Sequence, residues 1–226
     1  MGKDTLPGNC YICGEQLSKL AMKNHLIKTC MVEEAGQEAL LLKVEGAYDK
    51  NYWLYLDIPL TATLGALDDF LRKIWLDCCG HMSGFYYEGQ RHNHIGMSRK
   101  LQNFLPGETL GYDYDFGTTT ELLISVVEEV RRPSQKGAVR LLARNVPPKF
   151  VCCKCGKPAE HINTESMYDE DNPFYCAECA ANPEYADEEM LLPVTNSPRM
   201  GSCAYDGDLD VYTFNPANAK GHVKPA

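Results

Sequence analysis

The sequence predicts an α+β protein, with a small mixed sheet and one main helix, flanked by two small zinc-binding units. Apolar runs with the periods of strands and of one amphipathic helix fill the middle of the 226-residue chain. Cysteines instead gather in C-x2-C pairs near both ends. The net charge of −9 comes entirely from residues 155–226, since residues 1–154 hold 18 basic and 18 acidic side chains. We therefore divide the chain into units 1–35, 36–148 and 149–226.

The first unit, residues 1–35, carries a zinc-finger pattern. A glycine follows a pair of cysteines, and a helix predicted over residues 16–28 carries a histidine. The spacing is C-x2-C-x11-H-x4-C, which supplies the four nitrogen and sulfur ligands that zinc requires. The predicted ligands are Cys10, Cys13, His25 and Cys30. A segment this short cannot fold on apolar burial alone, so we expect the metal to stabilise it.

The middle unit, residues 36–148, has the pattern of a folded core. Strands are predicted over 39–44 and 52–58, and Thr63 is a good N-cap for a helix that runs to about Cys78. A short strand over 85–87 and a short helix over 98–105 follow. Alternating or β-branched residues then predict strands over 112–116, 122–130 and 138–144. The resulting order is ββαβαβββ, which is typical of an α+β fold.

The third unit, residues 149–226, begins after a double proline and repeats the cysteine pattern. Its spacing of C-x2-C-x20-C-x2-C predicts a four-cysteine zinc site built from Cys152, Cys155, Cys176 and Cys179. Cys153 is an alternative to Cys152, and His161 is a distant reserve ligand. Weak patterning over residues 204–226 predicts a flexible tail.

The expected cofactor is therefore zinc, two ions per chain, in a structural role. Neither site leaves an open coordination position, so we assign no catalytic residue and no other cofactor-binding residue. No apolar run approaches about 18 residues, which argues against a membrane span. The first residues lead into no apolar signal segment, and the cysteines have metal-ligand spacing. We expect a cytoplasmic protein with reduced thiols.

Several motifs of the middle unit resemble one known family. They are the run 53–59, the dipeptide Thr63-Leu64, Trp75, His81 and the run 112–117 (Tyr-Asp-Tyr-Asp-Phe-Gly). Together they resemble the plasmid pRiA4b open-reading-frame-three-like proteins over most of residues 38–131. The resemblance implies an α+β fold, an association with mobile elements and no established activity.

This chain departs from the family at polar positions. Ser83 stands where the family often has a histidine, and Thr118, Thr120 and Leu122 stand where it often has aspartate, tryptophan and histidine. These departures argue against catalysis here. The stretch 192–201 also looks like the C-terminal signature of some members.

An enzymatic alternative rests on a second group of nucleophilic and ligand-type side chains. Cys78, Cys79, His81, His92 and His94 lie close together in the sequence. They could hold a third metal or form a cysteine–histidine pair. We favour a structural interpretation, in which Cys78 belongs to the buried stripe of the helix and the two later histidines lie in a polar loop.

The favoured function is a non-enzymatic zinc-binding adaptor that contacts another protein. The acidic last unit favours a basic partner. Lysines at positions 3, 19, 23 and 28 give the first unit a mildly basic face, so nucleic-acid binding is the first alternative. Its spacing differs from that of the fingers that read DNA, and protein contact therefore ranks above it.

Overall fold

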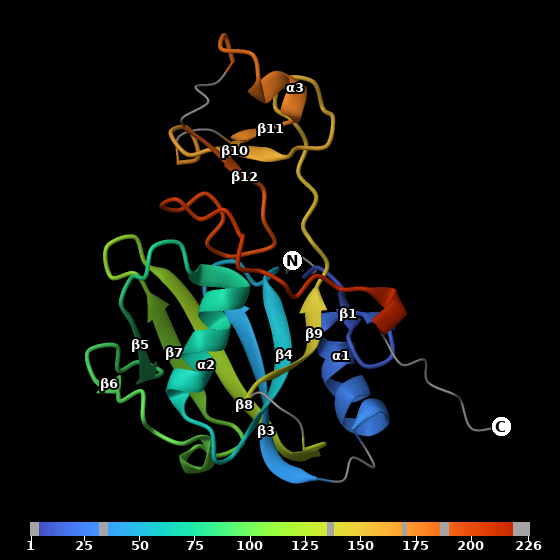
Figure 1. Cartoon of the computed structure of the whole chain (residues 1–226), viewed down its shortest axis with the longest axis vertical. Coiled ribbons are helices and arrows are strands. Elements are labelled where there is room, and N and C mark those ends of the chain that lie inside the picture. Colours follow the sequence, from blue (N-terminus) through green and yellow to red (C-terminus); the bar gives the residue numbers. More distant parts are fainter. Residues whose placement is uncertain (1–4, 32–35, 135–137, 169–170, 186–189, 219–226) are drawn as a thin grey trace, which may run out of the picture.

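A nine-stranded sheet is the largest feature of the computed structural model, which describes residues 5–31, 36–134, 138–168, 171–185 and 190–218 (Figure 1). Its strands are β1 (Gly8–Cys10), β2 (Gln16–Leu17), β3 (Gln37–Gly46), β4 (Trp53–Pro59), β5 (Ser83–Tyr87), β6 (His94–Ile95), β7 (Thr109–Tyr114), β8 (Thr120–Arg132) and β9 (Arg140–Asn145). They lie in the order β2-β1-β9-β4-β3-β8-β7-β5-β6. Each pairing among these described strands is antiparallel.

One face of this sheet packs on helix α2 (Leu64–Leu71), which a π-helical turn extends over Arg72–Leu76. Thr63 is the N-cap, because its hydroxyl accepts a hydrogen bond from the backbone N–H of Ala66. Alternate residues of the sheet, including Leu42 and Ile124, meet Leu67 and Trp75 in the main core. The predicted strands over 39–44, 52–58 and 122–130 and the predicted N-cap are confirmed.

The opposite face of the sheet is covered by helix α1 (Lys19–His25) and the π-helical turn over Leu26–Cys30. Met22 and Leu26 are fully buried there against Leu41 and Trp53 of the central strands. The N-terminal segment is therefore packed on the same sheet to which β1 and β2 contribute strands.

The predicted fold class, a small mixed sheet with one main helix, is wrong. The sheet is larger because β1 pairs with the free edge of β9, where Asn9 faces Arg144, and β2 adds a further strand. The helices are short, with 7 residues in α1 and 8 in α2. Among the described residues, no helix combines the length and apolar content needed to cross a membrane.

The helix predicted over 98–105 is also wrong, since only a single 3-10 turn forms over Leu101–Asn103. Backbone pairing explains this outcome. The N–H groups of Leu101 and Gln102 donate to the carbonyls of Ala62 and Leu60, which fixes the segment against the start of α2. These N–H groups are then not available for a helix.

Residues 149–193 form a smaller unit beside one end of the main sheet (Figure 1). It contains β10 (His161–Asn163), β11 (Phe174–Tyr175), helix α3 (Ala177–Ala180) and β12 (Leu191–Pro193). The strand order is β11-β10-β12, again antiparallel. Its buried apolar cluster is small, with Tyr175 and Ala180 as the buried members.

After this unit the chain returns to the main sheet as an irregular segment, residues 194–214, which we call the strap. Arg199 and Tyr205 of the strap are buried, and the Ser197 hydroxyl donates to the backbone carbonyl of Trp75. Tyr212 stacks edge-on against Phe70 of α2 at 5.1 Å between ring centroids. The prediction of a flexible tail from residue 204 is therefore wrong for the strap, while residues 219–226 lie outside the described part of the chain.

Candidate metal centres

The four predicted ligands of the first unit come together at the junction of β1 and α1. Their ligand atoms all lie within 4.8 Å of one another. The sulfur atoms of Cys10 and Cys30 are 3.7 Å apart, and Nε2 of His25 lies 3.2 Å from Cys13 Sγ and 3.1 Å from Cys30 Sγ. A tetrahedral zinc ion with bonds of about 2.3 Å to sulfur and about 2.0 Å to nitrogen separates two sulfurs by about 3.8 Å and a sulfur from a nitrogen by about 3.5 Å. The arrangement is therefore compatible with zinc.

Local backbone geometry explains how this first cluster is built. Gly14 has a positive φ of 87° and donates its N–H to the Cys10 carbonyl, which closes the turn between the first two cysteines. The π-helical turn places Cys30 near His25. In an α-helix, residues five apart point about 140° away from each other, whereas a π-helix pairs residue i with i+5.

The His25 ring is also oriented from outside the cluster. Its Nδ1 lies 3.4 Å from a carboxylate oxygen of Glu15, while Nε2 faces the sulfurs. A carboxylate behind a histidine ligand fixes the ring and raises the basicity of the nitrogen that faces the metal. In the metal-free cluster a hydrogen bond from the Cys30 thiol, together with nearby backbone N–H groups, lowers the pKa of Cys10 to about 5 although burial opposes this.

The second predicted group gathers in the small unit. Cys152, Cys155, Cys176 and Cys179 lie within 4.8 Å of one another, while Cys153 lies outside the group and packs near Tyr175. Cys155 Sγ is 3.6 Å from Cys176 Sγ and 3.7 Å from Cys179 Sγ. These separations again suit a tetrahedral four-sulfur zinc site.

The turn between Cys152 and Cys155 repeats the turn of the first cluster. Gly156, with φ of 73°, donates its N–H to the Cys152 carbonyl, as Gly14 does to Cys10. Burial raises the pKa of Cys152, but backbone N–H groups of Cys176, Lys154 and Cys155 outweigh burial and lower it to about 6. The backbone is therefore arranged to favour a thiolate before any metal binds.

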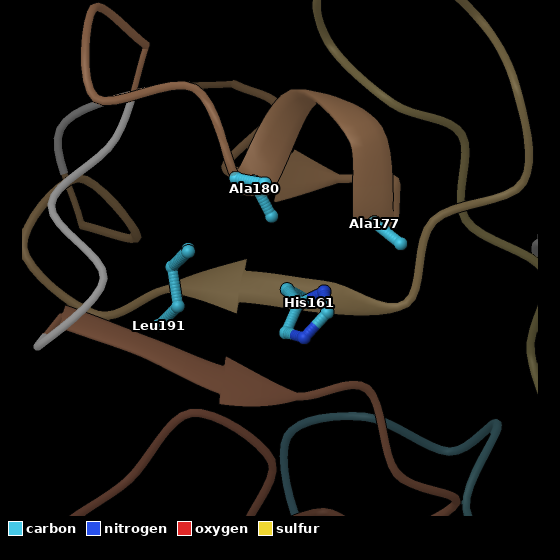
Figure 2. A pocket seen from close by; sticks show the side chains of 5 residues that line it. His161, Ala177, Ala180 and Leu191 are labelled. Atoms are coloured by element: carbon cyan, nitrogen blue, oxygen red, sulfur yellow. The ribbon is translucent and has the colours of Figure 1, made fainter.

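A pocket of about 410 Å³ lies next to the second cluster, between α3 and the three-stranded sheet (Figure 2). It is lined by His161, Ala177, Ala180, Ala181 and Leu191. The reserve ligand His161 therefore faces this pocket and is not part of the four-cysteine group. Small apolar side chains and one imidazole make the pocket suitable for an inserted side chain.

A third cluster joins three residues that the sequence grouped, Cys78, Cys79 and His81, to one that it did not, Cys203. Cys78, Cys79 and His81 follow α2, and Cys203 of the strap meets them from a position 124 residues away from Cys79. His92 and His94, which we had grouped with His81, lie outside this cluster and are exposed. In the sequence, Cys203 is distinguished only because it stands alone, outside the C-x2-C pairs.

Hydrogen bonds polarise the thiols of this third cluster. The imidazole of His81 lowers the pKa of Cys203 to about 7, since it binds the thiolate form. Hydrogen bonds to Cys78 and Cys203 raise the pKa of Cys79 to about 12. Cys203 therefore forms a thiolate more readily than Cys79.

Of the lysines of the predicted basic face, Lys19 is paired with a carboxylate, and Lys3 lies outside the described residues. Glu45 of β3 is 2.8 Å from Lys19 Nζ, 3.1 Å from Lys43 Nζ and 3.3 Å from Lys50 Nζ. Burial raises the pKa of Glu45, but the hydrogen bonds from Lys19 and Lys43 outweigh it and lower the pKa to about 2. This network connects the start of α1 to the sheet and reduces the positive potential of the first unit.

Comparisons with known proteins do not identify a function. No family model matches the chain, and no curated protein matches it. A crystal structure of a protein of unknown function from Methanosarcina mazei Go1 matches with a TM-score of 0.39 and 15% identity. The match covers 54% of this chain and 76% of that one. A similarity of this size carries no argument about function.

Proposed function

We propose that the protein is a non-enzymatic interaction protein whose first and second clusters hold structural zinc. The observation that carries the proposal is that each cluster already contains four nitrogen or sulfur ligands at tetrahedral separations. Catalytic zinc sites keep three protein ligands and leave the fourth position to water or substrate. A closed site instead stabilises the fold around it.

Zinc has a clear structural task in the small unit. Its described apolar cluster is small: Tyr175 and Ala180 are buried with Cys153, Cys179 and Leu191 packed against them, and Ile162 is a further buried apolar side chain. Such a core cannot offset the conformational entropy of ordering the chain. Metal binding at the four cysteines therefore supplies the missing stability.

The small unit also has an acidic surface that suits a basic partner. Glu160, Glu165, Asp171 and Glu184 are exposed on it. Binding of zinc by four thiolates adds two further negative charges to this unit. The pocket beside α3, lined by small side chains and His161, offers room for one side chain. We propose a partner segment that carries several lysines or arginines and one side chain that enters this pocket.

Metal analysis tests the structural part of this proposal. We expect the purified chain to hold zinc, and Cys155→Ser to hold one ion fewer and to lose the protected amide hydrogens of residues 149–193. Cys153→Ser is the matched control, since Cys153 lies beside the cluster but outside it. A wild-type chain without zinc at these sites, or an unchanged Cys155→Ser variant, would contradict the proposal.

A random peptide library displayed on phage tests the partner. Peptides selected on the zinc-loaded chain should be rich in basic residues, and their affinity should fall as salt rises. Ala181→Trp, which fills the pocket beside α3, should abolish selection, while Ala217→Trp on an exposed turn should not. Selection of acidic peptides, or of peptides indifferent to Ala181→Trp, would refute the basic-partner proposal.

Nucleic-acid binding is the second candidate, and one observation favours it. Lys19, Lys23 and Lys43 all line a hollow of about 340 Å³ between α1 and the sheet. It ranks lower because Lys19 and Lys43 already pair with Glu45. We expect no shift of labelled single- or double-stranded DNA or RNA at low salt. A salt-sensitive shift that is lost in Lys23→Ala would reverse this ranking.

The family resemblance and the mobile-element association remain predictions. The motif residues Trp53, Trp75 and Tyr112 are buried core residues in this structure, Trp53 on the face covered by α1 and the other two on the face covered by α2. Their role here is to stabilise the core, and they carry no argument for an activity.

A further inference from the structure

We propose that Cys78, Cys79, His81 and Cys203 form a third zinc site, which fastens the strap to the main sheet. The site goes beyond the two zinc ions of the proposed function and does not depend on them. Its four ligand atoms lie within 4.8 Å of one another, as in the other two clusters.

The separations within this cluster match a single tetrahedral ion. Cys79 Sγ lies 3.7 Å from the sulfurs of both Cys78 and Cys203. His81 Nε2 lies 3.0 Å from Cys79 Sγ and 3.5 Å from Cys203 Sγ. The same sulfur–sulfur separation occurs between Cys10 and Cys30, where the sequence alone predicts a finger. Three thiolates and one imidazole are a common structural set for zinc.

A disulfide explains the cluster less well. A bond between Cys79 and Cys203 would use two of the sulfurs and would not account for the convergence of Cys78 and His81 on the same point. A cysteine–histidine nucleophile would need one sulfur, whereas three converge on one imidazole nitrogen. A shared metal ion is the arrangement that uses all four groups.

The surroundings of the cluster favour thiolates. Arg199 of the strap is fully buried, and its guanidinium donates to Cys78 Sγ at 3.5 Å. Three thiolates and one zinc ion leave a charge of about −1. A buried cation beside the sulfurs stabilises that charge, and an N–H donor to a thiolate ligand is a typical outer contact of a metal site.

The position of the cluster indicates what a bound metal would stabilise, namely the attachment of the strap to the main sheet. Cys78, Cys79 and His81 belong to the connection between α2 and β5, whereas Cys203 lies near the middle of the strap, at a positive φ of 56°. An ion bound to all four residues closes a loop of more than a hundred residues, which contains the small unit. Zinc would hold the strap in place as a cross-link does.

Exposure distinguishes this site from the other two. None of the four residues of the third cluster is buried, whereas Cys10 of the first cluster and Cys152 and Cys176 of the second are buried. A chelator can therefore approach the third ion most easily. We expect three zinc ions per chain, of which the ion at Cys203 leaves first.

Native mass spectrometry of the full chain, refolded with zinc under reducing conditions, tests the proposal. The wild type should carry three zinc ions, and Cys203→Ser and Cys79→Ser should each carry two. Cys153→Ser should keep three, since Cys153 is the one cysteine outside the three clusters. Substitution with ¹¹³Cd should show three resonances, of which one disappears in Cys203→Ser. Circular dichroism verifies that each variant is folded.

Limited proteolysis tests the fastening role. Cleavage within the strap should become at least tenfold faster in Cys203→Ser than in Cys153→Ser at saturating zinc. Two ions in both the wild type and Cys203→Ser, or a wild-type mass two hydrogens lower without a third ion, would overturn the third site. An equal cleavage rate in both variants would overturn its fastening role. Either result leaves the first two clusters untouched, so the failures are distinguishable.

Discussion

Replacing Arg199 with methionine should destabilise the whole protein by about 3 kcal/mol. Arg199 is fully buried, and its guanidinium contacts the Asp115 carboxylate at 2.8 Å, the Thr118 carbonyl at 3.0 Å and the Thr120 hydroxyl at 3.1 Å. Removing one partner of a buried ion pair costs about 3–5 kcal/mol, because the other charge stays buried without compensation. Asp115 retains slight exposure, which places the expected cost at the lower end of that range.

Urea unfolding at saturating zinc, followed by tyrosine and tryptophan fluorescence, measures this cost. Arg99→Met, at an exposed site, is the matched control and should change stability by less than about 0.5 kcal/mol. Adding Asp115→Asn to Arg199→Met should recover part of the loss, because asparagine is neutral and tolerates the positive φ of 65° at that position. If Arg199→Met causes a similar loss of stability in a chain that also carries Cys203→Ser, the loss comes from the ion pair with Asp115 and not from the third cluster. A cost below about 1 kcal/mol would refute the reasoning.

Two further predictions concern the contact between α1 and the sheet. Because the pKa of Glu45 is lowered to about 2, its ion pairs stabilise the fold above about pH 4.5 and are lost as the pH falls towards 2. Glu45→Gln should therefore cost about 2 kcal/mol at pH 6 and less than half of that at pH 3, while Glu38→Gln, exposed on the same strand, should cost little. Leu26→Ala should cost about 3 kcal/mol in urea unfolding, since Leu26 is fully buried beneath the first cluster. Leu20→Ala, whose side chain is 71% exposed in the adjoining α1, should change stability by less than about 0.5 kcal/mol. Equal effects of Leu26→Ala and Leu20→Ala would contradict the packing of α1 on the sheet.

Local patterns explain which parts of the fold the sequence could predict. The strands over 39–44 and 122–130 alternate or are rich in β-branched residues, and Thr63 has a short-range N-cap role. The extent of the sheet could not be predicted in this way. The pairing of Asn9 with Arg144 joins segments far apart in the chain, and nothing in either segment alone indicates the other.

The metal-ligand clusters likewise divide into those with a local sequence pattern and one that joins distant segments. Eight cysteines and histidines stand at finger spacing, so each group of four could be recognised, and the structure brings both groups together. The choice between Cys152 and Cys153 followed from spacing, and the structure places Cys152 in the group. For the third cluster the sequence indicated Cys78, Cys79 and His81, but the fourth member could not be predicted because Cys203 reaches Cys79 across 124 residues. Only a folded chain shows that the strap returns to that point.

The path of the strap has a consequence for synthesis on the ribosome. The Tyr11 hydroxyl donates to the Tyr212 carbonyl, a contact between residues 201 positions apart. A nascent chain can form the hairpin of β3 and β4 early, but the contacts at both ends of the sheet must wait until the strap has left the exit tunnel. Until then the pocket for Arg199 and the thiols of Cys78 and Cys79 lack their last partners. The protein should therefore depend on a reducing environment and on chaperones until the strap is made, and ribosome-bound fragments ending before residue 194 should be protease-sensitive.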